Sequence, residues 1–324
     1  MSRLSFLALA LVAALFACSD KGAGGKPLIA VIPKGSTHEF WKAMHAGAAK
    51  AAREHGARID WKSAVKEDER PGQISVVEDF VNRKVAGIVL APLDDQALVG
   101  PVEEAKAAGI PVVIVDSGLR STSWVSYVAT DNKKGGSIAA EALGTALQGE
   151  GRVVMMRYQE GSASTSLREA GFLETLRTKF QKIEILSDNQ HGGATTDSAM
   201  AVAENLLAKH KDTVTGIFCP NESTTMGMLR ALQTTKLAGK VRFVGFDSSS
   251  KLVEALKAGE IDGLVLQNPF RMGELGVKTI LDHLKGQKVE RVQDTGATLA
   301  TKANMDQPDI KILLVPDLSE LSRG

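Results

Sequence analysis

The chain has 324 residues, of which 44% are hydrophobic and 24% are charged. This composition is ordinary for a soluble globular protein, and the length suffices for one large or two medium domains. The formal net charge of +1 provides no overall field that would favour nucleic acid or an anionic membrane surface as a partner.

The N-terminal residues, MSRLSFLALALVAALFACSDKGAGGK, have the layout of an export signal. Arg3 precedes an apolar stretch that is too short to span a bilayer, and small residues follow before Cys18. The sequence LFAC, which ends at Cys18, resembles a bacterial lipobox, in which the signal is removed and the cysteine becomes N-terminal and lipidated. We expect a signal peptide at 1–17 and a lipidated, flexible tether at 18–27, with an ordinary cleaved signal as the alternative.

Cysteine usage agrees with export. If Cys18 carries lipid, Cys219 in the apolar run VTGIFCP is the remaining thiol of the sequence. It then has no partner for a disulfide, a metal cluster or a Cys–His site, so we expect a buried, unreactive thiol. After the N-terminal segment, no stretch approaches the roughly 20 apolar residues that a membrane-spanning helix needs.

From Leu28 onward, short apolar runs rich in Val and Ile alternate with segments of helical periodicity. The runs are PLIAVIP, ARIDWKS, VAGIVLAP, GIPVVIVDS, SYVAT, GRVVMMRY, KIEILSD, VTGIFCPN, VRFVGFD and DGLVLQN. Their near-continuous hydrophobicity predicts parallel strands buried on both faces, and the intervening helices predict a doubly wound α/β architecture. These strands are more than a single domain of this type usually contains, and a second series of strands and helices begins after ATDNKKGG. We therefore expect two similar lobes.

Polar and aromatic residues cluster where these predicted strands end, which is where open α/β sheets bind ligands. The segments at these ends are VIPKGSTHEFW, VDS, TDN, RYQEGSASTSLR, PNES, FDSSS and QNPF. Carboxylates and amides bond hydroxyl groups, and aromatic faces stack on the C–H faces of a ring. The inventory therefore favours a neutral, hydroxyl-rich ligand.

In these motifs the chain resembles the type I periplasmic sugar-binding proteins of ABC transporters, particularly the ribose-binding branch. The resemblance runs from about residue 26 to about residue 303 and is carried, in family order, by FWKAMHAGA, GIPVVIVDS, ATDNKKGG, SLREAGF, FCPNESTTMGMLRALQ, FVGFDSS and VLQNPFRMGELGV. It implies two Rossmann-like, doubly wound lobes joined by a three-stranded hinge and closing around one sugar. The implied parts are an N-terminal lobe at 28–130 plus 268–294, a C-terminal lobe and tail at 131–267 plus 295–324, and crossings near Thr130/Asp131, Gln267/Asn268 and 294–296.

The resemblance also implies roles for individual residues. Phe40 and Trp41 match the paired aromatics of the sugar slot, and Asp116 matches a carboxylate of the first lobe that contacts sugar hydroxyls. Asn221, Asp247 and Gln267 match an amide and a carboxylate of the second lobe and a hinge amide, and Asn132 lies at the first crossing. The full set of candidate ligand-binding residues is His38, Phe40, Trp41, Asp116, Asn132, Ser166, Arg168, Asn221, Asp247 and Gln267.

Several positions depart from the ribose-binding pattern, so ribose is not assigned. Ser117 and Ser166 stand where ribose binders carry two arginines, with Arg168 two residues beyond the second. Ala194 replaces an expected aromatic, and His38 replaces an asparagine.

Structural roles remain open alternatives for these candidates. In the structural alternative, Trp41 packs its helix against the core, and Asp116, Asn221 and Asp247 serve in turns or as helix caps. His38 and Glu39 are otherwise solvated or at a helix N-terminus. We interpret the mixed charge run KEDER at 66–70 as a solvated turn.

The function we expect is that of a periplasmic, lipid-anchored, monomeric solute-binding protein that delivers a sugar or polyol to an ABC permease. It is not an enzyme and needs no cofactor, metal or nucleic acid. A transcription factor of the same fold would need a helix-turn-helix before residue 26, where the signal lies. A Rossmann-type enzyme would show the motif G-x-G-x-x-G directly after the first strand. In this sequence the segment after the first strand is PKGSTHEF, which lacks that motif. A subunit that presents its ligand to a membrane sensor remains an alternative.

Overall fold

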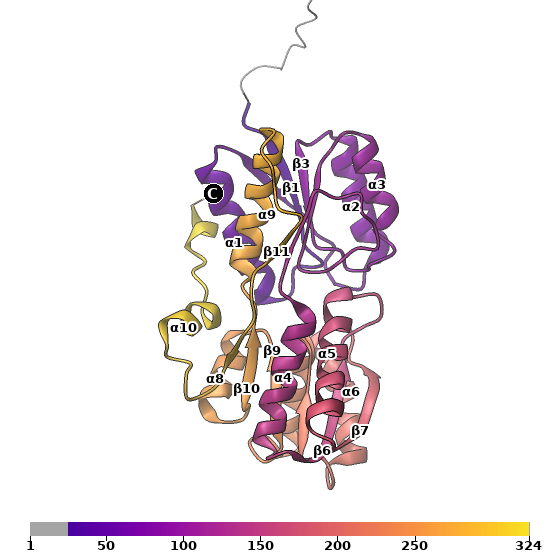
Figure 1. The fold of residues 1–324 in the computed structure, drawn as a ribbon, viewed down its shortest axis with the longest axis vertical. Helices are drawn as coiled ribbons and strands as arrows, with labels where there is room; N and C mark the ends of the chain where they lie inside the picture. Colours follow the sequence, from indigo (N-terminus) through magenta and orange to yellow (C-terminus); the bar gives the residue numbers. More distant parts are fainter. Residues whose placement is uncertain (1–24, 324) are drawn as a thin grey trace, which may run out of the picture.

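The computed structural model describes residues 25–323, and in it the chain forms two α/β lobes that lie one above the other in Figure 1. Each lobe is built on a six-stranded sheet with helices on both sides. This confirms the predicted fold class. The signal peptide and Cys18 lie outside the described residues.

The first lobe contains a fully parallel sheet in the order β11-β5-β4-β3-β1-β2. Its strands are β1 (Leu28–Ile32), β2 (Arg58–Trp61), β3 (Gly87–Leu90), β4 (Val112–Val115), β5 (Ser126–Ala129) and β11 (Val292–Asp294). Its helices are α1 (Glu39–Glu54), α2 (Arg70–Asn82), α3 (Val99–Ala107) and α9 (Pro269–Leu284). Separate apolar clusters cover the two faces, one with α1 and α9 and the other with α2 and α3.

The second lobe repeats this order as β12-β10-β9-β8-β6-β7, with β12 antiparallel to β10. Its strands are β6 (Glu150–Arg157), β7 (Lys182–His191), β8 (Gly216–Phe218), β9 (Arg242–Phe246), β10 (Gly263–Leu266) and β12 (Thr298–Ala300). Its helices are α4 (Asn132–Ala146), α5 (Ala163–Lys179), α6 (Thr196–His210), α7 (Glu222–Thr234), α8 (Ser250–Ala258) and α10 (Pro308–Leu314). By position in the sheets, β4 of the first lobe corresponds to β9 of the second.

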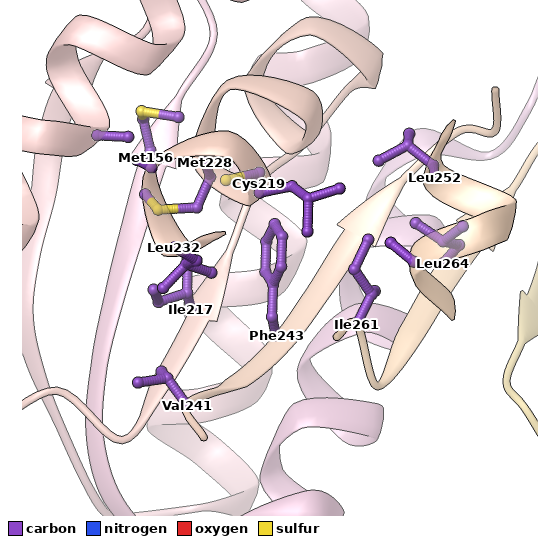
Figure 2. Packing of buried hydrophobic residues seen from close by; sticks show 14 of the residues in the cluster. Met156, Ile217, Cys219, Met228, Leu232, Val241, Phe243, Leu252, Ile261 and Leu264 are labelled. Carbon is purple, nitrogen blue, oxygen red and sulfur yellow. The ribbon is translucent and has the colours of Figure 1, made fainter. Parts of the chain in front are cut away.

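Cys219 lies in the apolar core of the second lobe, in one cluster with Met228 and Phe243 (Figure 2). Its side chain is fully buried, and burial raises the pKa of the thiol well above its ordinary value. The structure therefore agrees with the expectation of an unreactive core residue, because the thiolate is the reactive form.

The chain passes between the lobes at three places in the middle of the molecule (Figure 1). Residues 130–131 join β5 of the first sheet to α4, and residues 267–268 join β10 of the second sheet to α9. Residues 295–297 join β11 in the first sheet to β12 in the second. A ligand held between the sheets would therefore lie beside all three crossings.

The C-terminal tail contacts both lobes. Ile310 and Leu314 of α10 belong to the apolar cluster of the second lobe. The 3₁₀ helix η1 (Ser319–Ser322) then contacts α1, where Nε and Nη2 of Arg53 donate to the two carboxylate oxygens of Glu320 at 3.0 and 3.1 Å. Within residues 25–323, no helix combines the length and apolar character needed to cross a membrane.

Candidate functional site

A cavity with about 300 Å³ of empty volume lies between the two lobes, at the carboxyl ends of the strands. Eight of the ten candidate residues line it, and Asn132 and Ser166 do not. The complete lining is Lys34, His38, Phe40, Trp41, Glu67, Asp116, Tyr158, Ser164, Thr165, Arg168, Asn221, Asp247 and Gln267.

The lobes touch across this cavity in a closed arrangement. Lys34, which follows β1, donates from Nζ to Oγ of Ser162 at 3.3 Å and of Ser164 at 3.1 Å in the second lobe. The Tyr158 hydroxyl, which follows β6, donates to Oε2 of Glu67 in the first lobe at 2.7 Å. Loops of both sheets therefore meet around the cavity.

Phe40 and Trp41 form one wall of the cavity from the first turn of α1. Their ring centroids are 4.8 Å apart and the rings are nearly perpendicular, an edge-to-face arrangement that aromatic pairs favour. Both are buried, at 8% and 4% exposure, although consecutive helical residues differ by about 100° in direction. Both can be buried because this turn of α1 faces its own core on one side and the second lobe on the other.

Glu67 lies at the centre of the polar contacts in the first lobe, with an exposure of only 3%. Its carboxylate accepts from Nε1 of Trp41 at 2.7 Å and from the Tyr158 hydroxyl, and it pairs with Nδ1 of His38. The interpretation of 66–70 as a solvated turn is therefore wrong at Glu67. Its partners lie 26 to 91 residues away along the chain, so no local pattern reveals them.

His38 and Glu67 form a buried ion pair. Burial by itself lowers the pKa of His38, but the charge of Glu67 and the hydrogen bond to it raise the value to about 9. Burial likewise raises the pKa of Glu67, but the His38 charge and hydrogen bond, with help from Lys34, lower it to about 2. Both groups are therefore charged at neutral pH, and Nε2 of His38 remains a donor.

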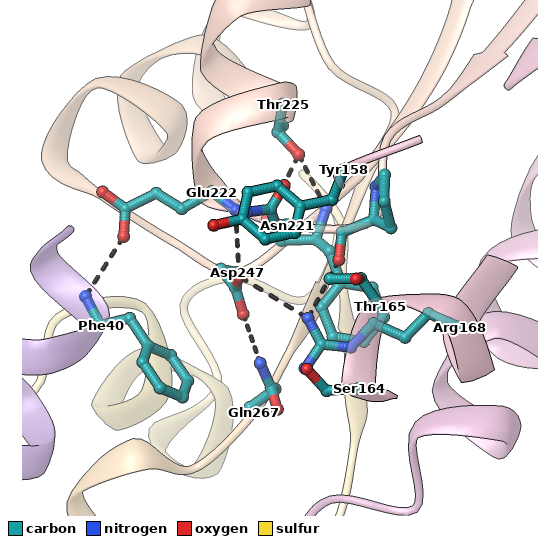
Figure 3. A network of polar contacts seen from close by, with 12 residues as sticks. Phe40, Tyr158, Ser164, Thr165, Arg168, Asn221, Glu222, Thr225, Asp247 and Gln267 are labelled. Atoms are coloured by element: carbon teal, nitrogen blue, oxygen red, sulfur yellow. Dashed lines mark hydrogen bonds and ion pairs between the residues drawn. The ribbon is translucent and has the colours of Figure 1, made fainter. Parts of the chain in front are cut away.

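Asp116 and Asp247 occupy equivalent positions, directly after β4 and β9. Both have left-handed backbones, with φ of 60° and 67°, which aspartate adopts more readily than most residues. Asp116 pairs with Lys34 at 3.1 Å. Asp247 accepts from Nε2 of Gln267 at 2.7 Å and lies 4.0 Å from Nη1 of Arg168 (Figure 3). Burial raises the pKa of Asp247, and Arg168 opposes this rise.

Arg168 is buried at the cavity, with an exposure of 2%. Its Nε donates to Oδ1 of Asn132 at 2.7 Å, its Nη1 donates to the Pro220 carbonyl at 3.0 Å, and its guanidinium stacks on Phe246. Asn132, expected as a ligand contact, is engaged in positioning Arg168 and does not line the cavity.

Ser166 lies outside the cavity, so its assignment to the site is corrected. Its side chain is exposed, beside Arg157 and Glu174 on the outer surface. The reason is helical geometry, because a residue two positions after Ser164 on α5 points about 200° away from it. Ser164 and Thr165 provide the cavity hydroxyls instead.

Asn221 lines the cavity and also caps a helix. Its side chain accepts from the Thr224 N–H as the N-cap of α7. The two interpretations of this residue therefore both hold. Asp247 does not cap α8, whose N-cap is Ser249, but its Oδ2 accepts from the Glu222 N–H at the start of α7 at 3.0 Å.

Five cavity residues were absent from the candidate set, namely Lys34, Glu67, Tyr158, Ser164 and Thr165. Lys34 and Tyr158 lie within two residues of the ends of β1 and β6, so the strand-end rule applied to every polar residue would have found them. The hydroxyls lie in the GSASTS run at the start of α5.

Three buried polar atoms at the cavity have no hydrogen-bond partner among the described residues. They are Nε2 of His38, Nη2 of Arg168 and Oε1 of Gln267. Leaving a buried polar atom unpaired typically costs ~1–3 kcal/mol, so these two donors and one acceptor mark places for a ligand's polar groups. Because the cavity's cations each lie near a carboxylate, its chemistry suits a neutral ligand that both donates and accepts.

The cavity residues do not resemble a metal centre. Within residues 25–323, no group of three or more His, Cys, Asp or Glu side chains is arranged to hold a metal ion. Lys34, His38 and Arg168 instead occupy the neighbourhood of the carboxylates.

Comparison with known proteins identifies the family. Residues 29–288 match the model of the periplasmic binding protein domain. The chain is 30% identical to the D-ribose/D-allose-binding protein of Pseudomonas aeruginosa over 83% of this chain and 86% of the relative. It is 28% identical to the ribose import binding protein of Escherichia coli over 89% and 95% of the two chains.

Solved structures give the same result. A carbohydrate transporter solute-binding protein from Agrobacterium radiobacter, in complex with D-arabinose, is 36% identical with a TM-score of 0.87, covering 90% of this chain and all of that one. A solute-binding protein from Agrobacterium vitis with bound D-fucose is 36% identical with a TM-score of 0.85, covering 89% and 99%. The chain therefore belongs to the type I periplasmic sugar-binding proteins, the extracytoplasmic solute-binding components of ABC import systems.

Proposed function

We propose that this protein captures one neutral monosaccharide or polyol between its lobes and delivers it to an ABC permease. The observation that carries the proposal is the set of unpaired atoms at the cavity, Nε2 of His38, Nη2 of Arg168 and Oε1 of Gln267. Sugar hydroxyls both donate and accept, so one ligand type satisfies all three atoms. Phe40 and Trp41 provide aromatic surface for the C–H faces of its ring.

The lobes close because the ligand contacts both of them. Phe40 and Asp116 belong to the first lobe, Arg168 and Asn221 belong to the second, and Gln267 lies at a crossing between them. A ligand that contacts residues of both lobes shifts the equilibrium towards the closed form, because those contacts are complete only there. The permease then receives the closed form.

The names of the relatives support an aldose as the ligand. They include binding proteins for D-ribose or D-allose and complexes with D-arabinose and D-fucose. Ribose itself is not proposed, because Ser117 stands where the ribose-binding pattern carries an arginine. Lys34 paired with Asp116, and His38 paired with Glu67, supply cationic groups on the first-lobe side of this cavity.

The site residues have separate roles in this proposal. His38, Arg168, Asn221, Asp247 and Gln267 contact the ligand's hydroxyls, and Glu67 and Asn132 orient the ligand-contacting side chains. The names of the relatives as binding proteins support a protein that binds its ligand and catalyses no reaction. We propose in addition that it acts as a monomer and needs no cofactor. We also propose that Cys18 carries a lipid that anchors the mature protein to a membrane.

A thermal-shift screen of the mature protein tests this function. The panel comprises pentoses, hexoses, polyols, cyclitols, amino acids and nucleosides at equal concentration. A ligand that binds only the folded state raises the melting temperature by mass action, and we expect this for a neutral sugar or polyol. Ser166→Ala should keep the shift, because that side chain is exposed outside the cavity. A shift caused only by amino acids or nucleosides would contradict the proposed ligand class.

A further inference from the structure

Glu222 of the second lobe contacts the N-terminus of helix α1 in the first lobe. Its Oε1 accepts from the Glu39 N–H at 3.1 Å, and its Oε2 accepts from the Phe40 N–H at 3.2 Å (Figure 3 shows the second contact). Glu39 and Phe40 are the first two residues of α1, whose own N-cap, His38, makes no side-chain capping bond. The side-chain acceptor that caps the N-terminus of this 16-residue helix is therefore the Glu222 carboxylate of the other lobe.

The carboxylate of Glu222 is buried at this junction, with the residue 8% exposed. In the described part of the chain, its oxygens receive backbone N–H donors and no side-chain donor. The charged groups that act on it are His38, before α1, and Asp247, after β9, while the Glu39 side chain is exposed at the surface. In the closed arrangement this carboxylate is therefore buried without a direct counter-ion.

We propose that Glu222 takes up a proton when the lobes close, so that sugar capture is linked to pH through this one carboxylate. The inference rests on the proposed sugar-binding function and adds a positioning residue that contacts no cavity surface of its own. Glu222 acts through α1, because the same turn of helix carries Phe40 and Trp41 into the cavity.

The electrostatics of the closed form support this linkage. Burial raises the pKa of Glu222 to about 7, against the opposing effects of His38 and the two N–H donors, and Asp247 adds to the rise. When the lobes separate, the carboxylate returns to water and to an ordinary pKa near ~4.3.

The direction of the pH effect follows from these two values. Because the closed form holds the proton more tightly, closure is favoured at low pH and loses this advantage as pH rises through about 7. Sugar affinity should therefore weaken roughly tenfold between pH 6 and pH 8 through this group alone.

Calorimetry of sugar binding to the mature, full-length protein tests the inference. The probe is whichever of D-ribose, D-allose, D-arabinose and D-fucose gives the largest thermal shift, titrated at pH 6.8 in phosphate and in imidazole. The difference in binding heat between two buffers of unlike ionisation enthalpy measures the protons taken up. We expect the wild type to take up roughly half a proton more than Glu222→Gln.

Glu39→Gln is the matched control, because it removes an adjacent carboxylate that is exposed. It should keep the proton uptake and the tenfold difference in affinity, and Glu222→Gln should lose both. Circular dichroism and the melting temperature establish that each variant is folded. If Glu222→Gln does not fold, Glu222→Asp replaces it and should retain the proton uptake with weaker affinity.

Two results would overturn the inference while leaving the proposed function intact. One is sugar binding with equal proton uptake in the wild type and Glu222→Gln, and the other is a wild-type affinity that does not change between pH 6 and pH 8. If none of the sugars binds, the proposed function fails separately. Small-angle scattering without sugar then tests the inference alone, since the wild type should be more closed at pH 6 than at pH 8 and Glu222→Gln should not differ.

Discussion

At the scale of single residues, Glu67 has three side-chain partners, and one of them joins it to the other lobe. Trp41 and His38 contact it from its own lobe, and Tyr158 contacts it from the other. Its burial depends on these partners, because an ionised carboxylate without them would leave water at a large cost. Glu67 thereby fixes the orientation of three side chains that line the cavity.

Removal of Glu67 should be strongly destabilising. Glu67→Ala leaves the buried His38 charge and the Trp41 and Tyr158 donors without their acceptor. We expect the free energy of unfolding, measured by urea denaturation, to fall by roughly 3–5 kcal/mol. The adjacent, exposed Asp68→Ala is the control and should change stability by less than ~0.5 kcal/mol. Equal effects of the two substitutions would contradict the role of Glu67 as the shared acceptor of these buried partners.

The His38–Glu67 pair also predicts a pH dependence of stability. Because the pKa of His38 is raised from 6.5 to about 9, its contribution is full below 6.5 and is lost as pH rises through about 9. Because the pKa of Glu67 is lowered from 4.5 to about 2, its contribution is full above 4.5 and is lost as pH falls through about 2. The pair should therefore contribute most between pH 4.5 and 6.5.

Melting temperatures from pH 4 to pH 10 provide the measurement. The difference between the wild type and His38→Gln should be largest near pH 5–6 and should shrink towards pH 9, where the histidine loses its proton. A difference that is constant over this range would mean that His38 stabilises the fold by packing and not by charge.

At the scale of elements, close helix packing determines where site residues lie. Helices α4 and α5 approach each other at Gly136, where a Cβ atom would lie only 1.9 Å from the carbonyl oxygen of Arg168. The glycine in ATDNKKGG therefore permits the approach that positions Arg168 against the cavity. No side chain can be accommodated there without moving α5, because the opposing atom is backbone.

Gly136→Ala should weaken both the fold and the ligand site. We expect a loss of ~1–3 kcal/mol in the free energy of unfolding from overpacking, together with weaker sugar binding. Gly100→Ala is the control, since a Cβ there meets nothing within 4 Å and alanine favours helix by up to ~1 kcal/mol. If Gly136→Ala is as stable as Gly100→Ala, the packing of α4 on α5 is not as close as described.

The sequence predicts the sheet elements well, because each of the ten apolar runs overlaps one of the strands β1 to β10, and only β6 and β7 extend beyond their runs. Strands β11 and β12 are three residues long and only partly buried, so their composition carries little strand signal. The same difference explains the site. Positions directly after a strand are predictable, whereas Glu67 depends on distant partners and Ser166 was misplaced by the rotation of one helix.

At the scale of the whole molecule, three crossings and the C-terminal tail join the two lobes (Figure 1), and the candidate ligand cavity lies between these lobes. Polar side chains bond across the cleft both at the cavity, through Lys34 and Glu67, and beside it, through Glu222. The closed form is therefore held by polar contacts that water can replace when the lobes separate. Such contacts favour a reversible closure in which the ligand supplies the remaining free energy.

Isothermal titration calorimetry of the mature protein with a panel of neutral monosaccharides and polyols tests the central claim most directly. The account predicts saturable binding of one such ligand per chain, weakened at least ~100-fold by Arg168→Ala, which removes a buried donor of the cavity, and unchanged by Ser166→Ala. The absence of binding by any neutral sugar or polyol, or equal affinity in the wild type and Arg168→Ala, would contradict it.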